Sequence, residues 1–201
     1  MALLPDGPTA SRAAWTPPPV GHAFALRGWC GMSFNRGLVH FHDLPAGQRA
    51  TDRTRRVFGH VASGLVAFAV DWRGRQICAR PDHDGGMAMV ADISTARLST
   101  LARMEDLRAW LLDDDECDDA DQLFGPSAFR ASLRHHRLTR LRADRCFGYR
   151  VPPCLGGPAT PDNLVPTRTE DYWRETSDVL LRGSAPLPQP GPRRAVVLPV
   201  L

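Results

Sequence analysis

Adjacent prolines and adjacent glycines punctuate the stretch at residues 149–181, YRVPPCLGGPATPDNLVPTRTEDYWRETSDVLL, and constrain the fold more than any other part of the sequence. Pro152 and Pro153 lack backbone N–H donors and have a fixed φ. Such a pair does not fit the middle of a sheet, where each strand donates to its neighbours. Residues 150–154 are therefore predicted to be extended at the edge of a sheet.

A tight turn is predicted directly after the prolines. Leu155 is expected to point inward, and Gly156 and Gly157 permit a positive φ or a close approach of two backbone segments. A second turn is predicted at residues 161–163, because Pro, Asp and Asn are residue types that turns favour. The chain is thus expected to change direction twice before its last helix.

The last helix has predicted start and stop signals. Thr167 and Glu170 stand at S/T-x-x-E spacing, so the hydroxyl can cap an exposed amide while the carboxylate reaches back. Gly183 stands where a left-handed cap would end the helix. The apolar side of this helix is predicted to comprise Tyr172, Trp173, Thr176, Val179 and Leu180.

This order of elements resembles the C-terminal signature of the SUKH superfamily, which contains bacterial immunity proteins, including those of type VI secretion effectors, and the yeast cell-wall synthesis regulator family. The matching residues here are Tyr149, Pro152 or Pro153, Leu155, Gly156, Gly157, Asn163, Leu164 and Tyr172. Two upstream patches are similar to the same family and follow its order: Gly31-Met32-Ser33-Phe34-Asn35-x-Gly37-Leu38, and Phe58-Gly59, Gly64, Phe68 and Asp71.

The resemblance covers roughly residues 28–181 and implies a non-catalytic immunity protein that binds and blocks a cognate toxin, or a related protein-binding module. It also assigns structural roles to the motif positions. These are Gly31, Phe34, Gly37, Phe58, Gly59, Asp71, Leu155, Gly156, Gly157, Asn163 and Tyr172.

The middle of the chain predicts an α+β fold, in which a mainly antiparallel twisted sheet has helices packed on it. The predicted strands are residues 38–42, 57–59, 64–70, 75–80 and 86–91, with a hairpin turn at 71–74. Residues 44–56 are interpreted as a loop or short helix, and helices are predicted at about 100–112, capped by Ser99 or Thr100, and at 126–133. The inward stripe of the first of these is Leu101, Met104, Leu107, Trp110 and Leu111.

Length and composition predict one compact domain. The chain has 201 residues and 43% hydrophobic content. We expect a flexible Pro-rich arm at 1–20, the SUKH-like domain at 21–183 and a Pro-rich tail at 184–201. The N-terminus has no basic and apolar signal pattern, and the five cysteines form no C-x-x-C pair, so a cytoplasmic protein with reduced thiols is expected.

Charge is unevenly distributed although the net charge is only +3. Residues 113–121, DDDECDDAD, hold seven carboxylates, and residues 130–150 hold seven arginines. Such blocks can stay solvated, pair with each other or meet a charged partner. If the partner is a toxin with a basic cleft, the acidic block could mimic a polyanion. The candidate partner-binding residues are Asp113, Asp114, Asp115, Glu116, Asp118, Asp119 and Trp29, with Trp15 and Trp72 as alternative anchors.

The Arg-rich run raises nucleic-acid binding as an alternative function, because guanidinium groups bind phosphates well. Leucines and a phenylalanine interleave with the arginines, which is typical of an amphipathic surface segment: Leu133, Leu138, Leu141 and Phe147. Protein binding is therefore the favoured interpretation.

Other chemical sites find little support in the sequence. His40 and His42 share one strand face and could bind zinc with His60, Cys78 or His83, but no second pair stands at ligand spacing, so both are expected on the polar face of an exposed strand. Cys30 and Cys154 lie near glycines without an evident activating base. We predict no catalytic residue, no metal and no cofactor, and an enzyme with an unrecognised site is the second alternative.

Overall fold

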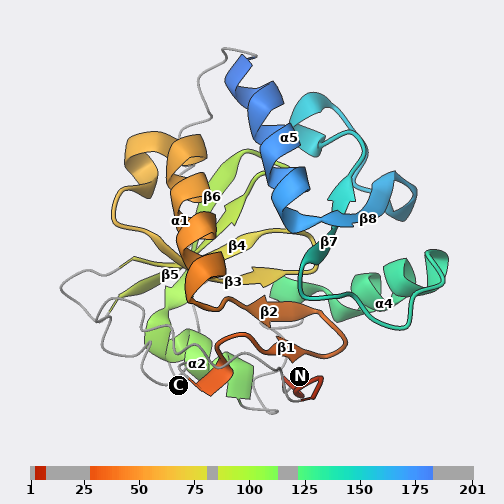
Figure 1. Ribbon diagram of the computed structural model, residues 1–201, viewed down its shortest axis with the longest axis horizontal. Helices are drawn as coiled ribbons and strands as arrows, with labels where there is room; N and C mark the ends of the chain where they lie inside the picture. Colours follow the sequence, from red (N-terminus) through yellow and green to blue (C-terminus); the bar gives the residue numbers. More distant parts are fainter. Residues whose placement is uncertain (1–2, 8–27, 81–85, 113–121, 183–201) are drawn as a thin grey trace, which may run out of the picture.

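Six antiparallel strands form a meander in which each strand pairs with its neighbours in chain order. The computed structural model describes residues 3–7, 28–80, 86–112 and 122–182 (Figure 1). The strands are β1 Ser33–Phe34, β2 Val39–Phe41, β3 Val66–Asp71, β4 Gln76–Arg80, β5 Met87–Asp92 and β6 Arg97–Arg103. The α+β fold with a mainly antiparallel sheet is thereby confirmed.

Both faces of the central strands are covered. Val66 and Phe68 of β3 pack into one hydrophobic cluster, and Ala67 between them packs into the other. In β4, Ile77 packs into the same cluster as Val66 and Phe68, and Cys78 packs into the same cluster as Ala67. An antiparallel strand with one solvated face would alternate apolar and polar residues, so the uninterrupted apolar run of β3 reflects burial on two sides.

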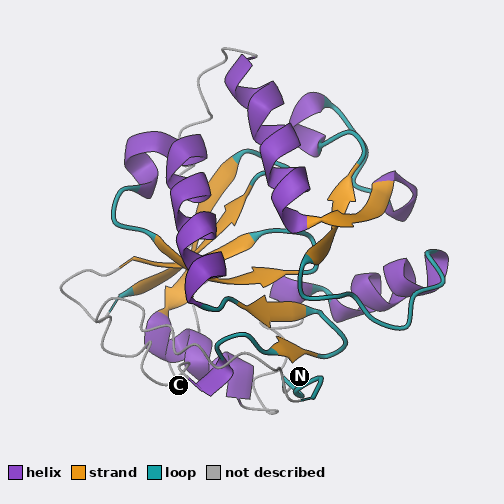
Figure 2. Cartoon of the chain, in the orientation of Figure 1, coloured by secondary structure: helices purple, strands orange, loops and turns teal. Residues whose placement is uncertain are grey.

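Two helices cover each face of the sheet (Figure 2). The helices α1 Leu44–Phe58 and α5 Thr169–Arg182 contact each other and contribute to one cluster. The helices α2 Met104–Leu112 and α4 Pro126–His135 contribute to the other cluster. Asp43 caps α1 by accepting a hydrogen bond from the backbone N–H of Ala46, which satisfies one of the free amides of the first turn.

A second, two-stranded sheet lies beside α5 and consists of β7 Arg145–Tyr149 and β8 Leu164–Arg168. The connection between its strands contains two short 3-10 helices, Pro153–Leu155 and Pro161–Asn163. The side chain of Asn163 shapes this connection, because its amide donates to the carbonyls of Val151 and Pro158 and its Oδ1 accepts from Val151 N.

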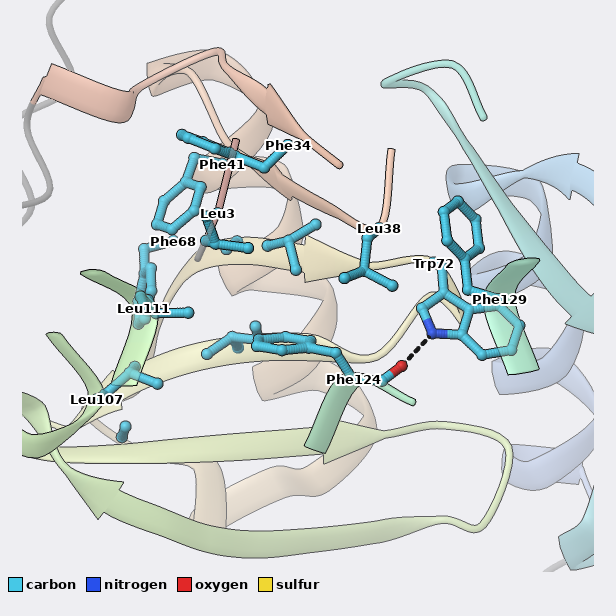
Figure 3. Packing of buried hydrophobic residues seen from close by; sticks show 14 of the residues in the cluster. Leu3, Phe34, Leu38, Phe41, Phe68, Trp72, Leu107, Leu111, Phe124 and Phe129 are labelled. Atoms are coloured by element: carbon cyan, nitrogen blue, oxygen red, sulfur yellow. Dashed lines mark hydrogen bonds between the residues drawn. The ribbon is translucent and has the colours of Figure 1, made fainter. Parts of the chain in front are cut away.

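The turn between β3 and β4, residues 71–75, joins the two sheets, and we call it the hub turn. The predicted hairpin turn at 71–74 is confirmed. The Trp72 indole donates to the carbonyl of Phe124 (Figure 3). The backbone N–H of Phe147 in β7 donates to the carbonyl of Trp72 at 2.7 Å. The Trp173 indole of α5 donates to the carbonyl of Gly74 at 2.6 Å. Three later segments are therefore tied to one turn.

Residues 3–7, which the sequence places in the N-terminal arm, contact the sheet. Leu3 is buried in the cluster with α2 and α4, and Pro5 forms a β-bridge with Phe34. The carboxylate of Asp6 accepts hydrogen bonds from the backbone N–H groups of Arg36 and Gly37. The turn between β1 and β2 is thus held by a residue about 30 positions earlier in the chain.

Two predicted boundaries in the middle of the chain are wrong. Val57 and Phe58 belong to the last turn of α1, because their side chains complete its buried face with Ala50 and Thr54. The sequence also places the start of a helix at residues 99–100, whereas these residues pair with β5 as part of β6, and α2 begins at Met104. Strand pairing with β5 overrides the capping signal there.

The predicted strand at 150–154 and the capping box are also wrong. β7 ends at Tyr149, the prolines lead into a 3-10 helix, and Leu155 is 44% exposed instead of pointing inward. Thr167 pairs with Cys146 inside β8, so its hydroxyl is not at the start of α5.

The last helix differs from its prediction in one buried position. Tyr172, Trp173 and Thr176 are buried as expected, whereas Val179 is 49% exposed. The predicted cap at Gly183 lies outside the described residues.

Replacement by Ala is expected to lower the free energy of unfolding by different amounts at the two glycines after Leu155. Gly156 has φ +86° and open space around it, so Gly156→Ala should cost about 1 kcal/mol of unfolding free energy through left-handed strain. A Cβ at Gly157 would overlap the carbonyl of Val151, so Gly157→Ala should cost about 3 kcal/mol. Urea denaturation of both variants measures the difference. Equal losses would contradict the close approach at Gly157.

Candidate functional site

The two strand histidines form a buried pair, which corrects the prediction of an exposed polar face. His42 is 6% exposed, and its Nε2 donates to Gln76 Oε1 at 2.8 Å. His40 is partly buried, and its Nδ1 lies 2.9 Å from Ser33 Oγ. The strand is not at the edge of the sheet, because it pairs with β1 on one side and β3 on the other, and His42 reaches Gln76 of β4.

The histidine pair is built to stay neutral. Burial lowers the pKa of His42 from its usual 6.5 to about 4, and the hydrogen bond with Gln76 opposes this shift only in part. Burial likewise lowers the pKa of His40 to about 4, against the attraction of Asp43. Within the described part of the chain, no group of three or more His, Cys, Asp or Glu side chains could hold a metal ion. His83 lies outside that part.

Two of the thiols are unsuited to nucleophilic chemistry. Cys78 and Cys146 are fully buried, and burial raises the pKa of each thiol from 9.0 to about 12. Burial also raises the pKa of Cys154, which is half-buried near the 3-10 helix after β7. Because the thiolate is the reactive form, these side chains are held in their unreactive state.

The most conspicuous charged pair inside the protein is structural. Asp71 is 3% exposed, its Oδ2 accepts from Arg75 Nε at 2.7 Å, and its Oδ1 accepts from the backbone N–H groups of Arg73 and Arg75. Arg75 also donates to the carbonyl of Leu123. The pair therefore rigidifies the hub turn, and both of its charges are satisfied within the protein.

A basic hollow lies where α4, the segment after it and the β1–β2 turn meet. We define the basic hollow by the side chains of Asp6, Arg36, Arg130, Arg134, Leu138 and Arg140. Leu133 and Thr139 complete its lining, and its volume is about 640 Å³. The backbone N–H of Leu141 donates to the carbonyl of Arg36 at 2.9 Å, which fixes the two sides of the hollow next to each other.

Some arginines of the protein have carboxylate partners, and within the described residues those of the basic hollow are not among them. Elsewhere Arg49 and Arg53 pair with Glu170. Among the described residues, no ion pair involves any of the hollow's four arginines, namely Arg36, Arg130, Arg134 and Arg140. Asp6 is the one carboxylate among the described residues of the lining, and it is held by two backbone amides. The hollow therefore concentrates positive charge at the surface.

The predicted partner-binding residues are divided between described and undescribed parts. The acidic residues from Asp113 to Asp119 and the alternative anchor Trp15 lie outside the described residues. Trp29 is half-buried and packs against Phe34 and Phe41 at ring-centroid distances of 5.0 and 5.1 Å. Trp72 is 1% exposed in the hub turn and presents no anchor to a partner.

Five of the motif positions that carry the family resemblance are buried, whereas Leu155 is exposed. Phe34, Phe58, Asp71, Asn163 and Tyr172 are buried. A side chain at Gly37 would overlap the carbonyl of Leu141 beside the basic hollow. The sequence signal at residues 130–150 pointed to the Arg-rich side of the hollow, but it missed Asp6 and Arg36, which lie far from it in the chain.

Residues 105–178 match a family model described as T6SS immunity protein Tdi1, C-terminal. The match runs from α2 through most of α5 and includes α4 with the residues that line one side of the basic hollow. It is a match to an immunity-protein family, as the resemblance implied, and the SUKH name stays a prediction.

The structure is also similar to a solved structure entitled "Crystal structure of Atu4351 from Agrobacterium tumefaciens". The TM-score is 0.48 and the sequence identity 14%, over 72% of this chain and 68% of that chain. A search of curated proteins finds no match. None of the helices in the described residues is long and apolar enough to cross a membrane.

The buried histidine pair predicts acid sensitivity. His42 stays neutral in the folded protein down to about pH 4, whereas the unfolded chain takes up its proton near pH 6.5. Its contribution to stability is therefore complete above pH 6.5 and is lost as the pH falls toward 4, by about 3 kcal/mol in total.

Denaturant unfolding between pH 7.5 and 4.5 measures this loss. His42→Gln should flatten the pH dependence, whereas the matched control His60→Gln, at an exposed position, should leave it unchanged. Identical pH profiles for the two variants would contradict the assignment to His42.

Proposed function

We propose that this protein is a non-catalytic immunity protein that binds a cognate toxin and neutralises it. The observation that carries the proposal is the match of residues 105–178 to the T6SS immunity protein family. The ordered motifs at Gly31 to Leu38, Phe58 to Asp71 and Tyr149 to Tyr172 support the same role through their resemblance to the SUKH superfamily.

The rigid attachment of the matched segment is consistent with a binding role. Three hydrogen bonds join the matched segment to the hub turn, through the carbonyl of Phe124, the backbone N–H of Phe147 and the indole of Trp173. The segment is therefore held rigidly against the six-stranded sheet. A surface held by such a scaffold binds with a small loss of conformational entropy. Inhibition then follows from covering the toxin's functional surface, with charge complementarity setting the rate of association and the specificity.

The proposed function predicts protection and direct binding. A strain that produces the cognate toxin should survive when the full-length protein is co-produced, and the purified pair should bind with a dissociation constant in the nanomolar range or below. Growth assays and calorimetry measure the two effects. Undiminished toxicity together with an absence of binding would overturn the proposal.

The acidic block offers one candidate contact with such a toxin. If these carboxylates mimic a polyanion, replacing Asp113, Asp114, Asp115, Asp118 and Asp119 with Asn should weaken toxin binding at least tenfold at low salt and reduce its salt dependence. Calorimetry at two salt concentrations checks both effects. Unchanged affinity and salt dependence would assign the block, including Glu116, to solvated surface.

A matched control neutralises five carboxylates on other parts of the surface. These are Asp52, Asp106, Asp162, Glu175 and Asp178, changed to Asn or Gln. The control variant has the same change in net charge, so it should reproduce only the non-specific part of the electrostatic effect.

A further inference from the structure

We propose that the basic hollow is a docking site for an acidic segment of a partner protein, in which carboxylates flank an apolar side chain. The proposal deepens the proposed function, because the partner would be the toxin. It differs from the role of the acidic block, since here the immunity protein supplies the positive charge and the partner the negative charge.

The arginines of this site come from two parts of the chain that are distant in sequence, the β1–β2 turn and residues 130–140. The β1–β2 turn contributes Arg36, α4 contributes Arg130 and Arg134, and the segment after α4 contributes Arg140. The hydrogen bond from Leu141 N to Arg36 O holds the turn beside that segment. The four guanidinium groups thus surround one concave space, which is the arrangement that binds carboxylates in a fixed geometry.

Electrostatic repulsion gives the basic hollow its affinity for anions. Four like charges around one space repel one another, and Asp6, the one carboxylate among the described lining residues, already accepts from two backbone amides. A bound acidic segment would remove this repulsion and form charge-assisted hydrogen bonds. By contrast, arginines such as Arg49 and Arg174 are already paired with neighbouring carboxylates.

The β1–β2 turn is strained in a way that keeps Arg36 at the rim. Asn35 and Arg36 both have positive φ, 52° and 65°, which costs free energy in residues that carry a Cβ. The carboxylate of Asp6 offsets this cost, because it accepts from the N–H groups of Arg36 and Gly37. Strain of this kind persists where the surroundings over-determine it, and it is common in binding sites.

The lining favours a peptide over a nucleic acid. It contains Leu133, the 36%-exposed Leu138 and Thr139, which fit an apolar side chain between two acidic ones. Among the described residues, the lining includes no aromatic side chain on which a base could stack. A volume of about 640 Å³ suits a few side chains.

A labelled peptide tests the site without reference to the toxin. Fluorescence anisotropy would measure binding of the full-length protein to the peptide Glu-Asp-Leu-Glu-Asp-Leu-Glu. Arg130→Gln, Arg134→Gln and Arg140→Gln together should weaken binding at least tenfold. The matched control changes three exposed arginines elsewhere, Arg56, Arg97 and Arg168, to Gln and should weaken it less than threefold.

Two outcomes of that experiment would overturn the proposal. One is an equal loss in the two triple variants, which would show a general charge effect. The other is tighter binding of a labelled single-stranded oligonucleotide that is lost in the hollow variant, which would assign the hollow to nucleic acid. Unfolding curves of both variants confirm that the fold is retained.

Binding of the cognate toxin separates this proposal from the proposed function. If the wild-type protein binds the peptide in the hollow but does not bind the toxin, the immunity role fails and the docking site stands. If the toxin binds the wild-type protein and the hollow variant equally well, the immunity role stands and the docking site is not where the toxin binds.

Discussion

The buried ion pair between Asp71 and Arg75 is the interaction on which the rest of the structure depends. It closes the hub turn, and the closed turn presents the carbonyls of Trp72 and Gly74 to the later parts of the chain. A buried pair of this kind contributes little net stability, because desolvation offsets the attraction. Its effect is geometric, since it places in one position the groups through which two sheets and the last helix are joined.

Much of the sheet could be predicted from local pattern. The apolar run before Asp71 and the turn after it indicate a hairpin by themselves, because their signals are contiguous in the chain. The failures share a physical cause. Phe58 has β propensity but lies on the buried face of α1, and Ser99 has capping chemistry but pairs with Val90 of β5. In both cases packing or strand pairing with residues outside the local window outweighs the local preference.

The candidate site was predictable only on one side. The arginines at residues 130–140 are visible as a charge block, whereas Asp6 and Arg36 join them through a backbone hydrogen bond and a pair of amides that no sequence spacing encodes. The match at residues 105–178 covers the visible side. The hollow therefore combines a family-like segment with a turn that lies outside the matched range.

The connection of Trp173 to Gly74, across 99 positions, has a consequence for synthesis on the ribosome. The β3–β4 hairpin leaves the ribosome before α5 does. Its hub turn is therefore without the Trp173 indole at first, because loop closure over such a distance is slow compared with local folding. During that interval the sheet face under α5 is exposed in the nascent chain. A chaperone that binds apolar strands would find its target there, and release would coincide with arrival of the last helix.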